Sequence, residues 1–265
     1  MDKKQADEVN EEISDEDLQL LVLEAQRESL EKEALEKNSR KIKRPFPKWI
    51  FWIMALVLFV NTFAMIFQIY SIPAIEFVKT SARLSAEEDI ARYKEAVVVV
   101  LTDVSKGTGF SISSDGTILT NYHVVEGENS VIVGYPEVGR FKADVIETYP
   151  SIDLAVLEVD EENLPYLDLA ENPTYKSDEP IIFIGNPLKF TGIANEGSLI
   201  GLHQLSDWNV PVMMMEAPVY RGNSGSPVLN EDGKVIGVVF ATLDHDEHGK
   251  VGLFVPIKEY YKTQK

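Results

Sequence analysis

The chain has 265 residues, of which 45% are hydrophobic, so it is long enough for one or two domains with a sizeable core. Its formal net charge of -18 at pH 7 repels phosphate backbones, which argues against a nucleic-acid partner. Because the sequence contains no cysteine, it excludes a disulfide framework, a cysteine nucleophile and thiolate metal sites.

Residues 1–48 form an acidic tail that ends in a basic run. Residues 1–37 carry 13 acids and 5 bases, and residues 38–48 carry 5 bases and no acid. The stretch from Ser14 opens with a capping-box pattern and continues with good helix formers, which predicts a solvated acidic helix or a partly disordered arm. A helix that binds a partner protein is the alternative that this charge-rich tail leaves open.

Residues 49–75 contain no charged side chain, and we expect a transmembrane helix over 49–71. Aromatic residues stand at both ends of the stretch, as in membrane headgroup belts, and Pro73 is expected to end the helix. Since the basic run precedes the stretch, the positive-inside rule predicts a single-pass chain with its N-terminus in the cytoplasm. The length of the stretch argues against a cleavable signal peptide, and residues 72–94 are expected to form a stalk.

Beyond residue 95 the pattern changes to short β-branched or aromatic runs separated by turn signals. Such runs at close spacing indicate an all-β sandwich or a pair of barrels rather than a βαβ array. The domain is expected to cover residues 95–258 and to be followed by a short C-terminal tail, residues 259–265.

Three segments of this domain carry residues of catalytic type. His123, in ILTNYHVVEG, follows an apolar strand at the entry to a turn, and Asp153, in SIDLAVLEV, precedes an alternating strand. Ser224 lies in RGNSGSP, a glycine-rich stretch that on its own is more often a turn than a nucleophile. A serine that attacks a carbonyl needs a histidine base and a carboxylate that holds the base in one tautomer. Together the three residues supply this set.

The order histidine, aspartate, serine along the chain is that of the chymotrypsin class. The three segments resemble trypsin-like serine proteases, and with GTGFSISSDG, IIFIGNPLKF and VGLFVPI they resemble the HtrA/Deg branch over about residues 90–258. The resemblance implies two six-stranded antiparallel β-barrels, with His123 and Asp153 from the first and Ser224 from the second. It also implies an oxyanion hole formed by the backbone N–H groups of Gly222 and Ser224.

Two features depart from the family pattern. Ser226 stands where the family usually has glycine, so the loop after the nucleophile is expected to rearrange less freely. HtrA-type enzymes usually carry a peptide-binding PDZ domain after the protease, whereas only eight residues follow Ile257 here. We therefore expect no PDZ domain and infer no regulation by peptide capture.

The resemblance also places the primary specificity pocket. Pro218, six residues before the nucleophile, is expected at its floor, and Phe240 and Thr242 are expected at the opposite wall. Since Pro218 carries no charge, we expect small or medium aliphatic substrate side chains such as Val, Ala or Leu. Glu216 is the one residue that could supply a preference for basic side chains.

These observations predict a membrane-anchored serine endopeptidase with an acyl-enzyme mechanism, acting in protein processing or quality control outside a bacterial plasma membrane. The alternative is a catalytically silent, protease-like protein that binds peptides or serves as a scaffold. No cofactor and no metal are expected: His245 and His248 lie among acids, but a solvated hairpin tip explains them without a third ligand. The expected partners are polypeptide substrates and the membrane, and a homo-oligomer is left open.

Overall fold

The computed structural model describes residues 15–39, 47–206, 208 and 210–264, and for residues 15, 17, 38, 39 and 64–76 it describes the backbone alone. The chain divides into two compact units, residues 1–65 and residues 66–265, which are treated separately. The first unit contains α1 (Asp15–Ser39), whose described side chains are exposed, and the beginning of α2 (Lys48–Leu84). α1 covers the acidic segment for which a helix or a disordered arm was expected.

α2 is one helix of 37 residues that continues past Pro73 instead of ending there. A proline removes one hydrogen bond from a helix. The part of α2 that follows Pro73 is stabilised by three buried side chains, those of Phe77, Ser81 and Leu84. Among the described residues, no helix is both long enough and apolar enough to cross a membrane. The transmembrane helix expected over 49–71 is therefore not supported, and the side chains of its last part, from residue 64, lie outside the described residues.

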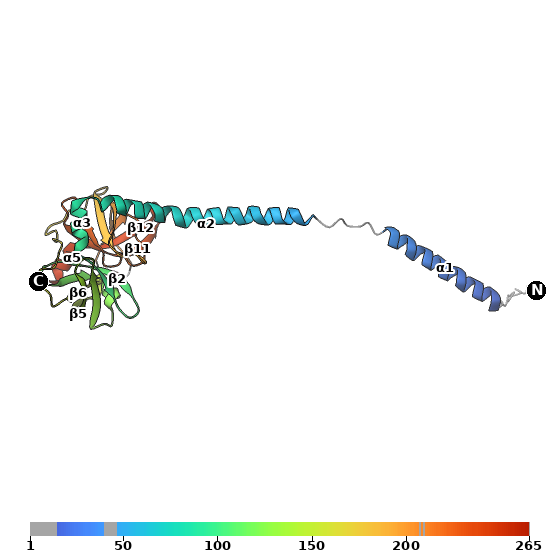
Figure 1. The fold of residues 1–265 in the computed structure, drawn as a ribbon, viewed down its shortest axis with the longest axis horizontal. Helices are drawn as coiled ribbons and strands as arrows, with labels where there is room; N and C mark the ends of the chain where they lie inside the picture. Colours follow the sequence, from blue (N-terminus) through green and yellow to red (C-terminus); the bar gives the residue numbers. More distant parts are fainter. Residues whose placement is uncertain (1–14, 40–46, 207, 209, 265) are drawn as a thin grey trace, which may run out of the picture. The chain divides into compact units, whose positions relative to one another are not determined.

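In the described part of the chain, the strands of the second unit form two closed six-stranded antiparallel barrels (Figure 1). The first barrel has the order β1-β2-β3-β6-β5-β4 and the second the order β10-β11-β12-β9-β8-β7. The strands of the first barrel are β1 (Val97–Leu101), β2 (Lys106–Ser111), β3 (Thr117–Thr120), β4 (Ser130–Tyr135), β5 (Gly139–Tyr149) and β6 (Leu154–Glu158). Those of the second are β7 (Pro180–Gly185), β8 (Ile193–His203), β9 (Val212–Glu216), β10 (Pro227–Leu229), β11 (Val235–His245) and β12 (Gly249–Pro256). The predicted pair of six-stranded barrels is confirmed.

Short helices connect or flank the barrels: α3 (Glu88–Glu95), α4 (Tyr122–Val125), the 3-10 turn η1 (Pro150–Ile152) and α5 (Ile257–Thr263). α5 covers most of the segment that was expected to be a C-terminal tail. Tyr260 of this helix is only 8% exposed, and its ring lies 6.3 Å from the ring of Tyr149 in the first barrel. The C-terminal helix therefore packs as part of the domain.

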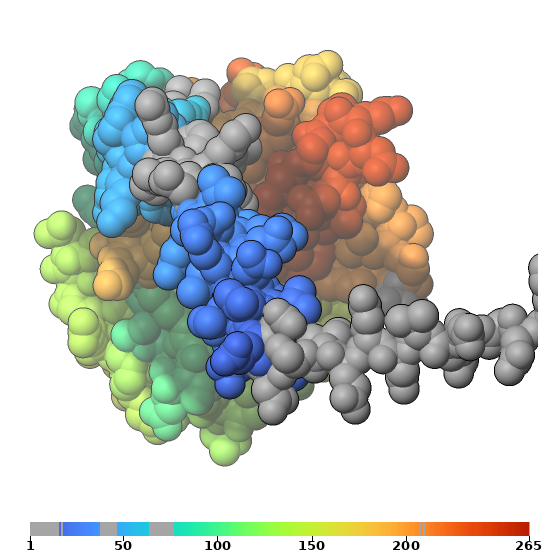
Figure 2. Space-filling view, turned by 90° about the vertical axis from the view of Figure 1, so that its right-hand side faces the viewer, coloured from blue at the N-terminus to red at the C-terminus, as the bar shows by residue number. Residues whose placement is uncertain are grey.

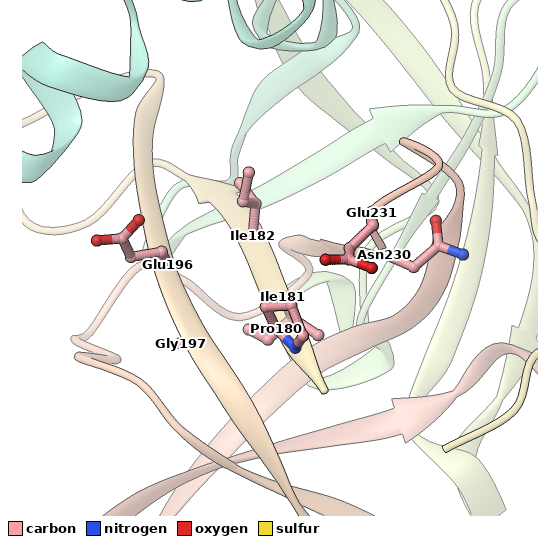
Figure 3. A pocket seen from close by; sticks show the side chains of 7 residues that line it. All are labelled: Pro180, Ile181, Ile182, Glu196, Gly197, Asn230 and Glu231. Carbon is pink, nitrogen blue, oxygen red and sulfur yellow. The ribbon is translucent and has the colours of Figure 1, made fainter. Parts of the chain in front are cut away.

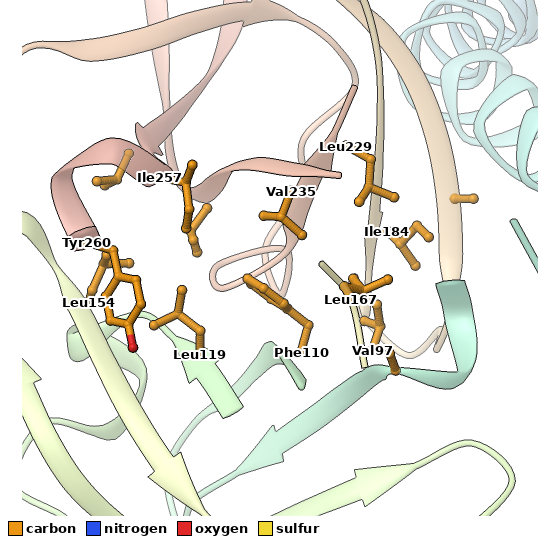
Figure 4. Close-up of a cluster of buried hydrophobic side chains, with 14 of the residues drawn as sticks. Val97, Phe110, Leu119, Leu154, Leu167, Ile184, Leu229, Val235, Ile257 and Tyr260 are labelled. Atoms are coloured by element: carbon orange, nitrogen blue, oxygen red, sulfur yellow. The ribbon is translucent and has the colours of Figure 1, made fainter. Parts of the chain in front are cut away.

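Each barrel has its own apolar core, and a further cluster joins the two (Figure 4). In this joining cluster Phe110 and Leu119 of the first barrel pack with Leu229 and Val235 of the second and with Ile257 of α5. All are at most 1% exposed, and burial of such a side chain contributes about 1.5–3 kcal/mol. The cluster holds the two barrels together, so that residues from both can meet at one site.

Candidate active site

His123 lies on α4, a single helical turn that follows β3 in the first barrel. The next two residues, Val124 and Val125, are buried in the core of this barrel and anchor the helix. The His123 side chain itself is 45% exposed. An imidazole on an anchored helix can therefore meet a substrate while its own backbone stays fixed.

Asp153 lies between η1 and β6 with φ 48° and ψ 46°, a left-handed conformation that aspartate adopts more readily than most residues. Its buried carboxylate accepts two hydrogen bonds from His123, one from the backbone N–H at 2.8 Å and one from ring Nδ1 at 2.6 Å. The Asp153 carbonyl in turn accepts a hydrogen bond from the buried side-chain amide of Asn121 at 2.9 Å. A proton on Nδ1 leaves the lone pair on Nε2, so the ring can act as a base at that atom.

Ser224 lies in the loop before β10 of the second barrel, yet its backbone is held by the first. Its carbonyl accepts a hydrogen bond from the Thr108 N–H of β2 at 2.8 Å. At Gly107, the preceding residue of β2, a Cβ would lie 2.6 Å from Val124 Cγ1 and 3.3 Å from the Ser224 carbonyl oxygen. Because glycine leaves this space open, the serine loop and the histidine helix approach the same point.

Thr108 connects both sides of the site, a role that the sequence analysis did not assign to it. This residue is fully buried, and its hydroxyl donates to the Gly222 carbonyl at 2.7 Å and accepts from the Asn186 N–H at 2.9 Å. The only sequence signal was its place in GTGFSISSDG, one of the segments that carry the family resemblance.

The Ser224 hydroxyl donates to the Phe240 carbonyl of β11 at 3.4 Å. Within the described residues no hydrogen bond joins this hydroxyl to the His123 ring. A distance of 3.4 Å is at the long limit for a hydroxyl hydrogen bond, so the bond to Phe240 restrains the serine only weakly. Such loose geometry is common before substrate binds and leaves the hydroxyl free to turn toward a base.

The turn that precedes Ser224 presents two free backbone donors. Asn223 N–H bonds to the Tyr220 carbonyl at 3.0 Å, and Gly222 lies inside this turn with φ +98°. The Arg221 carbonyl accepts from the Leu188 N–H at 2.9 Å, and since the C=O and N–H of a trans peptide point in opposite directions, the Gly222 N–H points away from Leu188. In the described part of the chain neither this N–H nor that of Ser224 has an acceptor, so both can bind an oxyanion.

The loop that orients this turn is itself held by a lysine. Leu188 has φ +53°, a left-handed conformation that costs about 1–2 kcal/mol for a residue with a branched side chain. Lys106 Nζ donates to the carbonyls of Leu188 and Phe190 at 2.9 and 3.0 Å and so supports the strained loop. Burial lowers the pKa of Lys106. No sequence motif singled out Leu188 or Lys106.

Ser226, one of the departures from the family pattern, is fully buried beside Asn223. Among the described residues its hydroxyl and the amide of Asn223 have no hydrogen-bond partner. A Cβ at Gly185 of β7 would contact both side chains. The serine hydroxyl therefore fills space that Gly185 leaves open and packs the nucleophile loop against the second barrel.

A cavity of about 320 Å³ adjoins the nucleophile. Phe240 and Thr242, the two residues expected at a wall of the specificity pocket, line this cavity, whereas Pro218 and Glu216 do not. The Phe240 ring stacks on that of Trp208 with centroids 4.5 Å apart, which fixes this wall. The cavity is lined by Val219, Tyr220, Arg221, Ser224, Val239, Phe240, Ala241, Thr242 and Lys250.

A second cavity, of about 350 Å³, lies at β7 and β8 and at the turn between β10 and β11 (Figure 3). Figure 3 shows Glu196 and Glu231 on opposite sides of an apolar floor formed by Pro180 and Ile181. Glu196 is paired with Arg83 of α2 at 2.6 Å. Since this cavity has neither a nucleophile nor a histidine, we do not assign the chemistry to it.

His245 and His248 lie at the tip of the β11–β12 hairpin, with their ring centroids 5.1 Å apart. The described residues contain no group of three or more histidine, cysteine or acidic side chains that could hold a metal ion.

The chain is similar to known serine proteases. Residues 107–238, about half of the chain, match the family model of the trypsin-like peptidase domain, and all three candidate catalytic residues lie within the match. A probable periplasmic serine endoprotease, described as DegP-like, from Pseudomonas fluorescens is 36% identical over 136 residues. The match covers 51% of this chain and 29% of that relative, so the chain spans less than a third of its length.

Two solved structures show the same fold. The Rv3671c protease of M. tuberculosis in its active form has a TM-score of 0.59 at 29% identity, covering 68% of this chain and 83% of that one. The HtrA-type protease AlgW, solved with a tripeptide, has a TM-score of 0.61 at 26% identity, covering 66% of this chain and 61% of that one.

Proposed function

We propose that this trypsin-like serine endopeptidase, which has HtrA-type and DegP-like relatives, cuts polypeptides with His123 as base, Asp153 as its carboxylate partner and Ser224 as nucleophile. The observation that carries the assignment is the double hydrogen bond from His123 to the Asp153 carboxylate, at 2.8 and 2.6 Å. A carboxylate bonded to both backbone and ring fixes the position and the tautomer of the base at once.

In the proposed reaction Ser224 Oγ attacks the carbonyl carbon of the scissile peptide bond while His123 Nε2 takes the hydroxyl proton. The negative charge that develops on the carbonyl oxygen is bound by the N–H groups of Gly222 and Ser224. His123 then returns its proton to the leaving amine, and an acyl-enzyme on Ser224 remains. A water molecule, deprotonated by His123, hydrolyses this ester and regenerates the serine.

Labelling with a fluorophosphonate probe, which bonds to an activated serine, tests this proposal. The full-length protein should be labelled and should cut a denatured protein substrate, whereas the Ser224→Ala variant should do neither. The alternative, a silent peptide-binding relative, requires that the wild-type protein bind peptides but show neither labelling nor cleavage. That outcome would overturn the proposed activity.

We further propose that the chain is tethered to a membrane through the uncharged stretch 49–75 and acts outside the cytoplasm, on substrates that are polypeptides. Two sequence features support the tether, the absence of charge over 27 residues and the basic run just before them. The DegP-like relative is described as periplasmic, which supports an extracytoplasmic site of action. Protease added to intact cells should degrade the peptidase domain and spare a tag on the N-terminus, and protection of the domain would refute this orientation.

A further inference from the structure

The cavity beside Ser224 carries positive charge that the sequence analysis did not anticipate. Lys250 of β12 and Arg221 of the oxyanion turn both line it. Lys250 lies on the β11–β12 hairpin, which is exposed on the surface of the second unit, in red-orange in Figure 2. None of the residues that line the cavity is acidic.

In the described part of the chain, neither cation forms an ion pair with a carboxylate. The nearest acid by strand register is Asp244, which pairs directly with Lys250 across the hairpin but forms no ion pair with it. Glu216, the residue that could have favoured basic substrates, does not line the cavity. Two cations thus line a cavity that also contains Ser224, although residues 49–265 as a whole carry a strongly negative net charge.

We propose that Lys250, with Arg221 at the same cavity, selects substrates that carry a carboxylate at or next to the cleaved bond, with glutamate in the pocket as the preferred residue. This proposal rests on the proposed protease function of Ser224. Both side chains are exposed, so water screens their charge, and an anionic substrate side chain beside them gains the modest attraction of a surface ion pair. The apolar walls of Val219, Val239 and Ala241 suit the methylene groups of a glutamate side chain.

The preference departs from the aliphatic one expected from Pro218, Phe240 and Thr242. Phe240 and Thr242 line the cavity, but Lys250 and Arg221 line it as well. Lys250 lies on the neighbouring strand β12, two residues before Gly252, which pairs with Thr242. Thr242 and Lys250 are therefore two register positions apart on the same face of the hairpin, since side chains alternate faces along each strand.

Matched peptides that differ at one position test the proposal. Full-length wild-type protein should cleave after Glu about three- to tenfold faster than after Gln, the range for one charge pair in a partly open site, and faster than after Val, Ala, Leu or Lys. Lys250→Met should abolish most of the Glu-over-Gln ratio, and Lys250→Arg should restore it. Lys142→Met removes the same charge at a 68% exposed site in the first barrel and should leave the ratio unchanged.

Equal rates after Glu and Gln, or dominant cleavage after Val, Ala, Leu, Lys or Arg, would overturn the proposal while leaving the protease function intact. A protein that neither cleaves any peptide nor takes the fluorophosphonate label would contradict the proposed function instead. Even then a second measurement tests the pocket. Ser224→Ala protein should bind product peptides that end in Glu more tightly than those that end in Gln, and Lys250→Met should remove the difference. Equal affinity for the two peptides would refute the role of Lys250.

Discussion

The end of α2 contacts the turn that carries the proposed oxyanion donors, and we expect this contact to affect activity. Phe77 is 5% exposed, and its ring meets that of Tyr220 edge to face, with centroids 4.9 Å apart and planes at 79°. The Tyr220 carbonyl closes the turn through its hydrogen bond to Asn223 N–H. One helical turn further on, the Ser81 hydroxyl accepts a hydrogen bond from the Ala194 N–H at 3.1 Å and holds the helix against β8.

Replacing Phe77 by alanine should therefore lower kcat without a comparable change in KM. An edge-to-face aromatic pair contributes about 0.5–1.5 kcal/mol beyond the burial of its area. If that free energy is lost from the ordered form of the turn, the donors are correctly oriented in fewer molecules, and kcat falls by about two- to tenfold. KM should move less, because Phe77 lies behind Tyr220 and lines no part of the cavity.

The assay compares steady-state kinetics and fluorophosphonate labelling rates of Phe77→Ala and Val78→Ala. Val78 is the adjacent residue of the same helix and is 42% exposed, so its truncation changes the helix without removing the aromatic contact. The expected result is a reduced kcat and a slower labelling rate for Phe77→Ala alone. Equal kinetics for the two variants, or a loss of thermal stability with unchanged kcat, would show that the contact is structural only.

Three further predictions concern the site and the core. Asp153→Asn should lower kcat by about 10⁴-fold with little loss of stability, because the amide keeps the shape but bonds to the wrong tautomer of His123; turnover within tenfold of wild type would contradict this. Gly222→Ala should lower kcat by about 10²–10³-fold, since a Cβ there would lie 2.7 Å from the Asn186 carbonyl oxygen and force the donor peptide to turn; unchanged acylation in a burst assay would refute it. Burial raises the pKa of Tyr260 to about 12. The contribution of its neutral phenol to the free energy of unfolding is therefore fully present below about pH 10 and is lost as the pH rises toward 12. Urea unfolding at about pH 8 and about pH 11 should show a smaller decline for Tyr260→Phe, and an identical decline would show that this phenol does not titrate with folding.

The barrels could be predicted, and the candidate catalytic segments could be found, because their signals are local. Short runs of β-branched residues between turns indicate strands wherever they occur, and the segments around His123, Asp153 and Ser224 each resemble a known pattern within a few residues. The hydrogen bonds between these segments, however, are known only from the structure. Asp153 bonds to the backbone of His123 as well as to its ring, and no sequence pattern indicates that second bond.

Features that depend on contacts between distant segments could not be read in this way. Residues 259–265 were expected to be a C-terminal tail, but Tyr260 is buried and its ring lies beside that of Tyr149 in the first barrel. Pro73 was expected to end a helix that in fact continues to Leu84, where packing on the domain outweighs the local effect of proline. Thr108 and Lys106 gain their roles only from loops more than 70 residues away in sequence, through bonds to Asn186 and Leu188.

The local charge of the cavity beside Ser224 also depends on contacts between distant segments and could not be predicted from the net charge. A net charge of -18 describes the long-range field of the chain and disfavours anionic polymers, but the field inside a cavity is set by the few charges that line it. In the hairpin sequence DHDEHGK only His245 and His248 were singled out, and Lys250 follows three acids there. The register of β11 and β12 puts it on the face of Thr242, and the acids of the hairpin tip do not line the cavity. An acidic protein can therefore place two cations at one cavity, and in the proposed specificity Lys250 and Arg221, rather than the net charge of the chain, select the charge of the substrate side chain.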